Sequence, residues 1–523
     1  MLAARSRPRS DHGLEPVRSR KDSLDRRQFL DRIGVASALT ILPRHVLGGP
    51  GHVAPSDRIN LAQIGCGTQS TRQVNGRLLT REDLQFTCVC DPNTDSTNYV
   101  DWSRDENRKI IRRLLGDPSW GARDPGIRGG REVSRQIIET YYGRGNRSGS
   151  YGGVRAYADF RELLDREADI DGLVIITPDH THAAIAIAAM QKGKAAVMHK
   201  PVSNVLHEVR RTIAVSRQDG VVSHLLAYGD HADHHKLDAW LKAGVIGPIR
   251  EVHNWTSRPF WPQGWLDYPT ETPAVPEGFD WDLWLGPEPH RAYHPSYTFA
   301  LYRGWYNYGG GCLADMGNYS LWPVYRLLDL GVPTSVEARC NTVAFVNEEN
   351  VSNHRLSQVA YPIAGTLHFR HSARGDRPPV EVYWYEGGIR PRTPEELYDA
   401  REDLDAEGMM FVGDSGKILC DFRGTEPRLL PESRMREVEG VTTPDDLEVV
   451  DSDDEWINAI KQGGRSRGSF DAVAALAEST ALAGVAFRMG GQRLDWDAQT
   501  ATFSNVPEAN AYLKREYRPG WEL

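Results

Sequence analysis

Four largely apolar runs lie in the first half of the chain, at residues 58–64, 84–90, 170–176 and 195–198. Runs of this length without regular polar alternation are typical of parallel strands that helices cover on both faces. The segments that follow them carry apolar residues at helical spacing, as in the alanine- and isoleucine-rich stretch after residue 182. The pattern predicts an α/β domain built on a parallel sheet.

A glycine-rich turn follows the first run. Gly65 and Gly67 lie in the turn, and Thr68 and Gln69 open the helical stretch after it. Such a turn lets backbone N–H groups at a helix start approach a pyrophosphate. The glycine spacing alone is a weak signal, because an ordinary loop explains it about as well.

An acidic residue strengthens the nucleotide interpretation. Asp91 ends the second run, 26 residues after Gly65, where a carboxylate bonds the ribose 2′-hydroxyl of NAD. A carboxylate there repels the 2′-phosphate of NADP, and no arginine follows it closely. We therefore expect a Rossmann domain that binds NAD in preference to NADP.

Polar residues also follow the later runs. Thr177, Pro178 and His182 come after the third run, and Lys200 comes directly after the fourth and His199. Parallel sheets bind ligands at the carboxyl ends of their strands. We expect these four residues to reach the cofactor, with Lys200 at the sheet edge.

Aromatic residues are dense between residues 255 and 308. Aromatic faces suit the apolar CH faces of pyranose rings, and arginines bond hydroxyl groups. Arg258, Trp261 and Trp305 are the predicted substrate contacts. A subunit interface, or a core beneath an irregular loop, explains the same composition equally well.

The second half of the chain predicts another domain. Segments 363–370 and 380–385 have strand patterns that suit an antiparallel sheet. Residues 470–489 predict a long helix with Ser469 as its cap, and the proline- and acid-rich residues 426–452 predict a loop.

Three segments divide the chain. Residues 1–54 form a signal and linker, residues 55–203 the Rossmann domain, and residues 204–523 the substrate domain. Within the Rossmann domain, the Arg-, Asp- and Gly-rich residues 101–150 predict a solvent-exposed insertion.

The N-terminal segment has the pattern of an export signal. Residues 25–31 read Asp-Arg-Arg-Gln-Phe-Leu-Asp and lead into a short apolar stretch at 33–42. That stretch is too short for a membrane span, which takes about 20 residues. It predicts twin-arginine export to the periplasm or another extracytoplasmic space, a route that carries folded proteins.

Composition and charge narrow the partners. The 523 residues carry a formal net charge of -9, and no basic run interleaves with aromatics, which argues against nucleic acid. The six cysteines form no CxxC and no paired spacing, so neither a disulfide framework nor a zinc knuckle is expected. The cluster at 230–235 is rich in histidine, but its spacing fits no common zinc motif. We expect small-molecule partners and no metal.

Together these motifs resemble the Gfo/Idh/MocA family, named for glucose-fructose oxidoreductase and inositol dehydrogenase. The matching pieces are Gly65-x-Gly67, Asp91, Thr177-Pro178 with His182, Lys200-Pro201, and the glycine-rich segment 309–317. The resemblance implies a Rossmann domain joined to an α/β domain with a large open, mainly antiparallel sheet, often in an oligomer. It also implies oxidation or reduction of a CH–OH group on sugars and cyclitols.

The family's catalytic positions carry over onto three residues. The resemblance implies that Lys200 contacts both substrate and nicotinamide, and that Asp315 and Tyr319 complete the site. Two residues depart from the family pattern: His199 replaces the usual glutamate before the lysine, and Tyr319 replaces the usual histidine.

The leading prediction is an NAD-dependent oxidoreductase of a secondary hydroxyl on a sugar, sugar derivative or cyclitol. Export favours a tightly bound cofactor, since reduced NAD is not easily recycled outside the cytoplasm. The first alternative is a glycoside hydrolase that oxidises C3 transiently, eliminates the aglycone and returns the hydride. The second is a non-catalytic sugar-binding protein, suggested by Tyr319 and His199.

Overall fold

The computed structural model describes residues 57–100, 103–146, 152–218, 220–441 and 449–523. The predicted export signal lies outside these residues.

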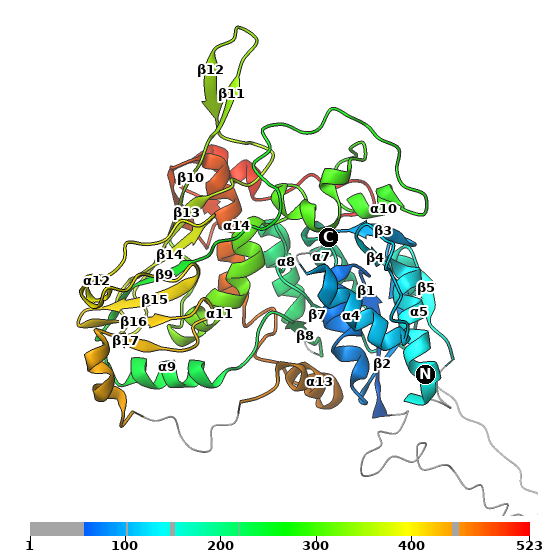
Figure 1. Ribbon diagram of the computed structural model, residues 1–523, viewed down its shortest axis with the longest axis horizontal. Helices are drawn as coiled ribbons and strands as arrows, with labels where there is room; N and C mark the ends of the chain where they lie inside the picture. The colour runs from blue at the N-terminus through cyan, green and yellow to red at the C-terminus, as the bar shows by residue number, and fades with distance from the viewer. Residues whose placement is uncertain (1–56, 101–102, 147–151, 219, 442–448) are drawn as a thin grey trace, which may run out of the picture. The chain divides into compact units, whose positions relative to one another are not determined.

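The first sheet is parallel and six-stranded, in the order β5-β2-β1-β6-β7-β8 (Figure 1). Its strands are β1 (Ile59–Ile64), β2 (Leu84–Cys90), β5 (Arg155–Tyr157), β6 (Gly172–Ile175), β7 (Ala195–Met198) and β8 (Ser223–Leu225). All five pairings are parallel, and the four predicted strands are confirmed. The sixth strand, β8, lies beyond residue 203, the predicted end of the Rossmann domain.

Helices cover this sheet, as its apolar strands require. They are α3 (Thr68–Ser70), α4 (Arg104–Leu115), α5 (Arg131–Tyr141), α6 (Phe160–Arg166), α7 (His182–Gln191) and α8 (Leu206–Ser216). Helix α7 packs on β6 and β7, whereas α5 packs on β2 and β5. The strands are therefore buried on both faces, as expected for a Rossmann domain.

The prediction that residues 101–150 form an exposed insertion is wrong for much of the segment. Helices α4 and α5 lie there, and β3 (Ser96–Tyr99) pairs with β4 (Ile127–Gly129). Ile111, Ile137 and Ile138 are wholly or almost wholly buried in the core. A few apolar residues at helical spacing are enough to anchor both helices, although charged residues dominate the composition.

The second sheet has nine strands, in the order β17-β16-β15-β9-β14-β13-β10-β18-β19. They are β9 (Ile249–Trp255), β10 (Ser335–Cys340), β13 (Gly365–His371), β14 (Val380–Glu386), β15 (Gly408–Gly413), β16 (Gly416–Cys420), β17 (Arg428–Leu430), β18 (Arg493–Asp497) and β19 (Thr502–Phe503). Only the β9–β14 pairing is parallel among them, so the expected large, mainly antiparallel sheet is confirmed.

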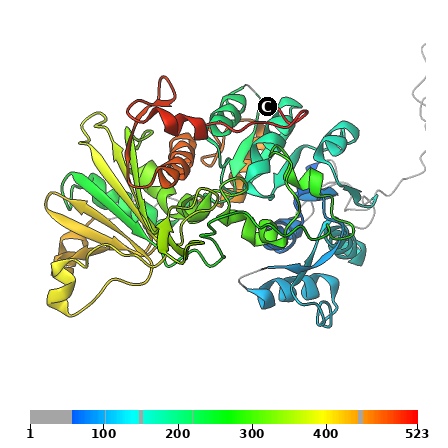
Figure 2. The ribbon, with the colours of Figure 1, turned by 90° about the horizontal axis from the view of Figure 1, so that it is seen from above.

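Helices flank the second sheet on one side (Figure 2). In addition to the helices that cover the first sheet, the described residues form α9 (Ala232–Lys242), α10 (Trp281–Leu285), α11 (Asn318–Leu327), α12 (Glu395–Ala400), α13 (Ser452–Gln462) and α14 (Ala474–Met489). Helix α14 packs between β10 and α8 and so joins the two sheets.

Two predictions for this half need correction. Helix α14 begins at Ala474, and the Ser469 hydroxyl accepts from the Ala472 N–H at 3.4 Å, one turn before the helix. The proposed loop at 426–452 contains β17 and a short helical turn at Glu432–Val438. Its apolar residues Leu429, Leu430 and Val438 are buried, which fixes it against the sheet.

Late segments of the chain complete the early domain. Trp456 and Ile457 of α13 lie fully or almost fully buried in the same core as β1. The tail beyond η10 (Pro507–Tyr512) then brings Arg515 to Glu208 of α8. The Rossmann fold is therefore not a continuous segment of the sequence.

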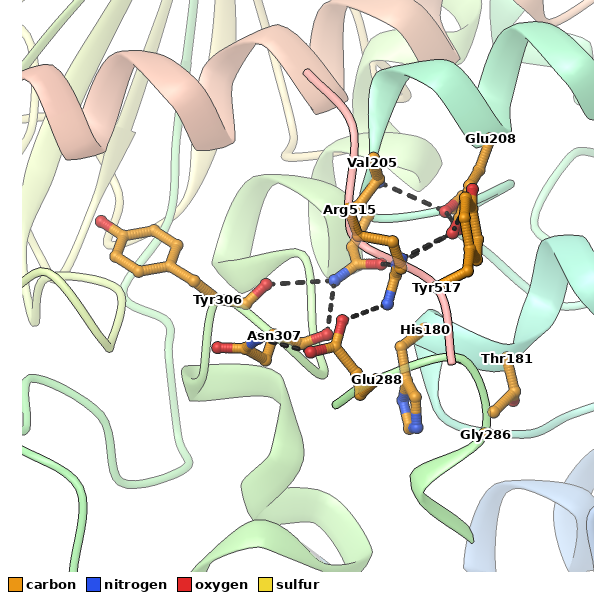
Figure 3. A network of polar contacts seen from close by, with 12 residues as sticks. His180, Thr181, Val205, Glu208, Gly286, Glu288, Tyr306, Asn307, Arg515 and Tyr517 are labelled. Atoms are coloured by element: carbon orange, nitrogen blue, oxygen red, sulfur yellow. Dashed lines mark hydrogen bonds and ion pairs between the residues drawn. The ribbon is translucent and has the colours of Figure 1, made fainter. Parts of the chain in front are cut away.

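Arg515 is the centre of a buried polar network (Figure 3). Its Nε lies 2.6 Å from Glu208 Oε1, and its guanidinium also pairs with Glu288. It donates to the Asn204 side-chain oxygen at 2.6 Å, and the Tyr517 hydroxyl donates to Glu208. At most 6% of any of the three charged side chains is exposed, so each charge depends on the others.

A hairpin of β11 (Val343–Val346) and β12 (Ser352–Arg355) extends away from the second sheet (Figure 1). Within the described ranges, every helix is too short or too polar to cross a bilayer.

Candidate active site

The glycine turn joins β1 to α3 and leaves no room for a side chain at Gly65. This residue has φ +85°, and a Cβ there would lie 2.2 Å from the Ile176 carbonyl oxygen. The close approach of the two strand ends therefore requires glycine. At Gly67 a Cβ would come within 3.0 Å of the Tyr99 ring, so the loop is tightly enclosed on that side.

Asp91 holds this loop against the end of β2. Its carboxylate accepts from the Cys66 N–H at 2.7 Å and from the Asn93 N–H at 2.8 Å. Burial raises the pKa of Asp91 to about 6, although these two backbone hydrogen bonds oppose the shift. Asp91 thus has a structural role, and a contact with a ribose hydroxyl stays a prediction.

Seven of the nine residues predicted to hold the cofactor line one cavity. It has a volume of about 120 Å³, and its lining includes Gly65, Gly67, Thr68, Gln69, Asp91, Thr177 and Pro178. Its wall combines a helix start, two glycines and a threonine at a strand end, which are the groups that bind a dinucleotide. This donor set fits NAD.

Two aromatic rings close part of that cavity. Tyr99 ends β3 of the Rossmann domain, and Phe299 begins a short helical segment, Phe299–Gly304, of the second domain. Their ring centroids are 4.1 Å apart, and both rings line the cavity. We call this pair the aromatic strap.

A larger cavity of about 630 Å³ adjoins the first one. Gln69, His199, Ala300 and Arg303 line both, so the two cavities share a wall. Besides Gln69, five predicted site residues line the larger cavity: Lys200, Arg258, Trp261, Asp315 and Tyr319. The structure therefore brings the predicted catalytic residues together beside the cofactor cavity.

Buried charges surround Lys200. Its ammonium contacts the Asp315 carboxylate, and only 3% of the lysine side chain is exposed. Arg303 lies 3.1 Å from the same Asp315 oxygen and 3.5 Å from Asp179. Asp179 also accepts from the Gly310 N–H at 2.9 Å, which ties the glycine-rich segment to the end of β6.

The charge state of Lys200 is set by this environment. Burial and the Arg303 cation lower the pKa of the Lys200 ammonium well below its usual value, whereas the carboxylates of Asp179 and Asp315 favour the charged form. A lysine held in this way can point its N–H groups at a substrate oxygen.

Tyr319 lies on α11 with its ring between two cations. The Lys200 nitrogen is 5.4 Å from the ring centroid, and the Arg423 guanidinium carbon is 4.9 Å from it. Its hydroxyl lies 2.8 Å from Nε2 of His199. Burial raises the pKa of Tyr319 to about 12 while Arg303 and Arg423 oppose that shift, so the phenol is protonated at neutral pH.

Two predicted site residues lie elsewhere. His182 lines neither cavity. Its Nδ1 lies 2.6 Å from the Pro201 carbonyl oxygen, and its Nε2 lies 2.9 Å from the Thr177 carbonyl oxygen. Trp305 is fully buried, stacks on Trp265 and donates to the Ser296 carbonyl. The aromatic residues around Trp305 form a hydrophobic core. At this position the region is therefore a core and not a substrate-binding surface.

Arg258 and Trp261 do reach the larger cavity, but other groups occupy their polar atoms. Arg258 forms an ion pair with Glu407 at 2.5 Å, and the Trp261 N–H donates to the Gln263 side chain. The cavity also reaches His231 and His234 of the histidine cluster. Among the described residues, no three His, Cys, Asp or Glu side chains are arranged to hold a metal ion.

Sequence reasoning missed several contacts of this site. Asp179 directly follows the Thr177-Pro178 motif, and that position was a usable signal for the same strand end. The contacts of His199 with Tyr319 and of Phe299 with Tyr99 join segments far apart in the chain, and no pattern in the sequence indicates them.

Family comparisons agree with this arrangement. Residues 131–226 match the model described as "Oxidoreductase family, NAD-binding Rossmann fold", and residues 237–364 match its "C-terminal alpha/beta domain". The site and fold are thus those of an oxidoreductase with an NAD-binding domain. Both matches are to Gfo/Idh/MocA family domains, in agreement with the resemblance seen in the motifs.

Individual relatives are more distant. Levoglucosan dehydrogenase of Pseudarthrobacter phenanthrenivorans is 28% identical over 22% of this chain and 31% of its own length. The dTDP-3,4-didehydro-2,6-dideoxy-alpha-D-glucose 3-reductase of Streptomyces antibioticus is 28% identical over 50% of this chain and 69% of its own length. Among solved structures, the WlbA dehydrogenase from Bordetella pertussis, in complex with NADH and UDP-GlcNAcA, has a TM-score of 0.46 at 14% identity, covering 84% of this chain and 99% of that one.

Proposed function

We propose that the protein is an NAD-dependent oxidoreductase that oxidises or reduces a secondary hydroxyl of a sugar, sugar derivative or cyclitol. One observation carries the proposal. Lys200, Asp315 and Tyr319 line a cavity that shares a wall with the cavity of the glycine turn. A substrate bound in the larger cavity would therefore be next to a nucleotide held in the smaller one.

Each residue has a separate task in this proposal. NAD, when bound, accepts or donates the hydride at the substrate carbon. Lys200 donates an N–H to the reacting oxygen, and Asp315 keeps the lysine in place. Tyr319 exchanges a proton with that oxygen, because it is a protonated phenol between two cations.

The sugar assignment is supported by the cavity and by the relatives. A volume of about 630 Å³ accommodates a small polyol beside the nicotinamide, and Trp261 offers an aromatic face. Levoglucosan dehydrogenase and the didehydro-sugar 3-reductase are relatives whose names state sugar chemistry. We extend that substrate class to this chain.

The proposal includes a retained cofactor and export by the twin-arginine route. The aromatic strap lies across the glycine turn and joins the two domains there. A cofactor enclosed in this way would accompany the folded protein to the periplasm. Oligomer formation is part of the same proposal and rests on the family resemblance.

The first experiment is to denature the purified protein and analyse the released small molecules by mass spectrometry. About one NAD or NADH per chain is expected. The native protein is then mixed with myo-inositol, D-glucose or levoglucosan, and the fluorescence of the bound nucleotide is recorded. No nucleotide, with no binding of added NAD, would contradict the proposal and favour a sugar-binding protein without catalysis.

A redox-neutral glycoside hydrolase is the second candidate, and the aromatic strap favours it. A nucleotide that cannot leave must regain its original oxidation state in each turnover. Transient oxidation at C3, elimination of the aglycone and return of the hydride would satisfy that requirement. Release of p-nitrophenol from nitrophenyl glycosides, lost in Lys200→Met, would identify this activity. If a broad panel releases none, the hydrolase is excluded.

A further inference from the structure

His199 and Tyr319 come from different domains and meet in the larger cavity. His199 follows β7 of the parallel sheet, whereas Tyr319 is the second residue of α11. The Tyr319 hydroxyl and the His199 Nε2 are 2.8 Å apart, a good distance for an O–H···N hydrogen bond. Only 3% of His199 is exposed, so this bond is shielded from bulk water.

A second neighbour indicates the direction of the bond. The side-chain nitrogen of Gln69 lies 3.4 Å from the same His199 Nε2. With this amide orientation, the Gln69 nitrogen donates and Nε2 accepts through its lone pair. The same lone pair accepts from the Tyr319 hydroxyl. In the neutral tautomer with its proton on Nδ1, the imidazole presents an acceptor at Nε2 to the phenol.

The surrounding charges agree with a neutral imidazole. Lys200, Arg303 and Arg77 are the cations that act on His199, and His182 is the nearby titratable ring. Burial and these cations lower the pKa of His199 well below its usual value. Burial raises the pKa of Tyr319 to about 12, so the phenol holds its proton at rest, while Arg303, Arg423 and Arg77 oppose that shift.

Lys200 is less suited to take the substrate proton. Its nitrogen contacts Asp315, and Arg303 lies on the other side of that carboxylate. The Asp315 carboxylate accepts from this nitrogen, so Lys200 already acts as a donor there. The hydrogen bond between the Tyr319 hydroxyl and His199 Nε2 joins two groups that are neutral at rest. A proton can therefore move from the phenol to the imidazole along this bond.

We propose that His199 is the proton acceptor behind Tyr319; this inference rests on the proposed oxidoreductase function. In the oxidation direction, the substrate C–H bond breaks and its hydride passes to NAD⁺ as oxidant. The substrate O–H proton passes to Tyr319 Oη, the phenol proton passes to His199 Nε2, and a C=O bond forms. The product side then holds a ketone, NADH and an imidazolium. Reduction follows the same path in reverse. Tyr319 is the catalytic residue and stays a neutral phenol, while His199 positions it and takes up its proton.

The test compares His199→Ala with His371→Ala as a matched control. His371 is also buried, with 2% exposed, but it bonds the Gly331 carbonyl and lies outside the cavity. Hydride exchange with bound nucleotide is measured with myo-inositol, D-glucose and levoglucosan. We expect His199→Ala to lower kcat about 100-fold or more, with KM little changed, and His371→Ala to leave both near wild type.

Chemical rescue separates a proton-transfer role from a packing role. Added imidazole should restore part of the kcat of His199→Ala but none of that of Tyr319→Phe, which retains the imidazole and lacks the phenol. Nucleotide content and thermal unfolding show whether each variant is folded. His199→Gln fills the site if the alanine variant unfolds, and it should be as inactive, because an amide does not take up a proton.

A spectroscopic readout tests the bond without any substrate. In protein labelled with ¹⁵N-histidine, Nε2 of His199 should have the shift of an unprotonated acceptor, and Tyr319→Phe should move it. A protonated Nε2 would overturn the proposal, as would a folded His199→Ala with wild-type kcat or no imidazole rescue. A wild-type protein that exchanges no hydride would instead contradict the proposed function and this inference with it.

Discussion

The rings of Phe299 and Tyr99 lie 4.1 Å apart and connect the second domain to the Rossmann domain across the glycine turn. Phe299 has φ 53°, which is unusual for a residue with a bulky side chain. The interaction of one aromatic pair is worth about 0.5–1.5 kcal/mol. Phe299→Ala should therefore release the retained nucleotide up to about tenfold faster, since 1.4 kcal/mol corresponds to a factor of ten.

Release is measured by dilution of the loaded protein and loss of nucleotide fluorescence. Phe345→Ala is the control, because Phe345 lies on β11 and lines neither cavity. Equal release rates in wild type and Phe299→Ala would show that the strap does not retain the cofactor.

Lys200→Met should abolish most hydride exchange and leave the cofactor bound. The variant keeps a chain of similar length but cannot donate to the reacting oxygen, and Arg303 remains beside Asp315. We expect kcat to fall about 100-fold to 10,000-fold. Lys192→Met serves as the control, because 44% of that lysine side chain is exposed and it pairs with Asp165 on the surface. Retained activity in Lys200→Met would remove the lysine from the catalytic site.

Glu386 predicts a pH dependence of stability. Its side chain is completely buried, one oxygen accepts from the Trp384 N–H at 2.8 Å, and burial raises its pKa to about 8. The native state therefore keeps the proton that the unfolded chain releases near pH 4.5. Because the folded pKa lies above the unfolded one, the contribution of Glu386 to stability is fully present below pH 4.5 and is lost as pH rises toward 8.

Glu386→Gln should remove this decline, because an amide stays neutral. The free energy of unfolding of the variant, relative to wild type, should increase by on the order of 4 kcal/mol between about pH 5 and about pH 8.5. Urea unfolding at the two pH values measures it, with the exposed Glu395→Gln as the control. A parallel pH dependence in wild type and Glu386→Gln would show that Glu386 is ionised in the native state.

Arg515→Met should destabilise the protein strongly. The substitution removes the cation that Glu208 and Glu288 share, and both carboxylates are at least 96% buried. Breaking a buried ion pair in this way costs about 3–5 kcal/mol. The matched control, Arg493→Met, breaks an exposed pair with Asp495 and should cost less than about 1 kcal/mol. Denaturant midpoints that coincide for the two variants would contradict this account.

Periodicity predicted the parallel sheet well, because buried strands have an unmistakable apolar pattern. The strands at 84–90 and 195–198 have the predicted bounds. For residues 101–150 the prediction relied on composition and not on periodicity, and it was wrong for much of the segment. Helices α4 and α5 lie there, rich in charged residues but anchored in the core by a few isoleucines. Strand β8 was missed because it has only three residues.

Motif spacing found the site residues near strand ends but not their contacts. Lys200 and Asp315 are 115 positions apart in the sequence, and the structure brings their charges into contact. Trp305 was misassigned because a buried aromatic core and a sugar platform have the same composition. The His199 contact depends on how the two domains pack, which one sequence does not specify.

The order of synthesis follows from the path of the chain. A ribosome produces β1 long before it produces Trp456, which fills the core beside that strand, and Arg515, which neutralises Glu208. Until then the early domain exposes an unfilled apolar site and an unpaired acid. The core beside β1 and the Glu208 ion pair can therefore be completed only after translation has passed these late residues.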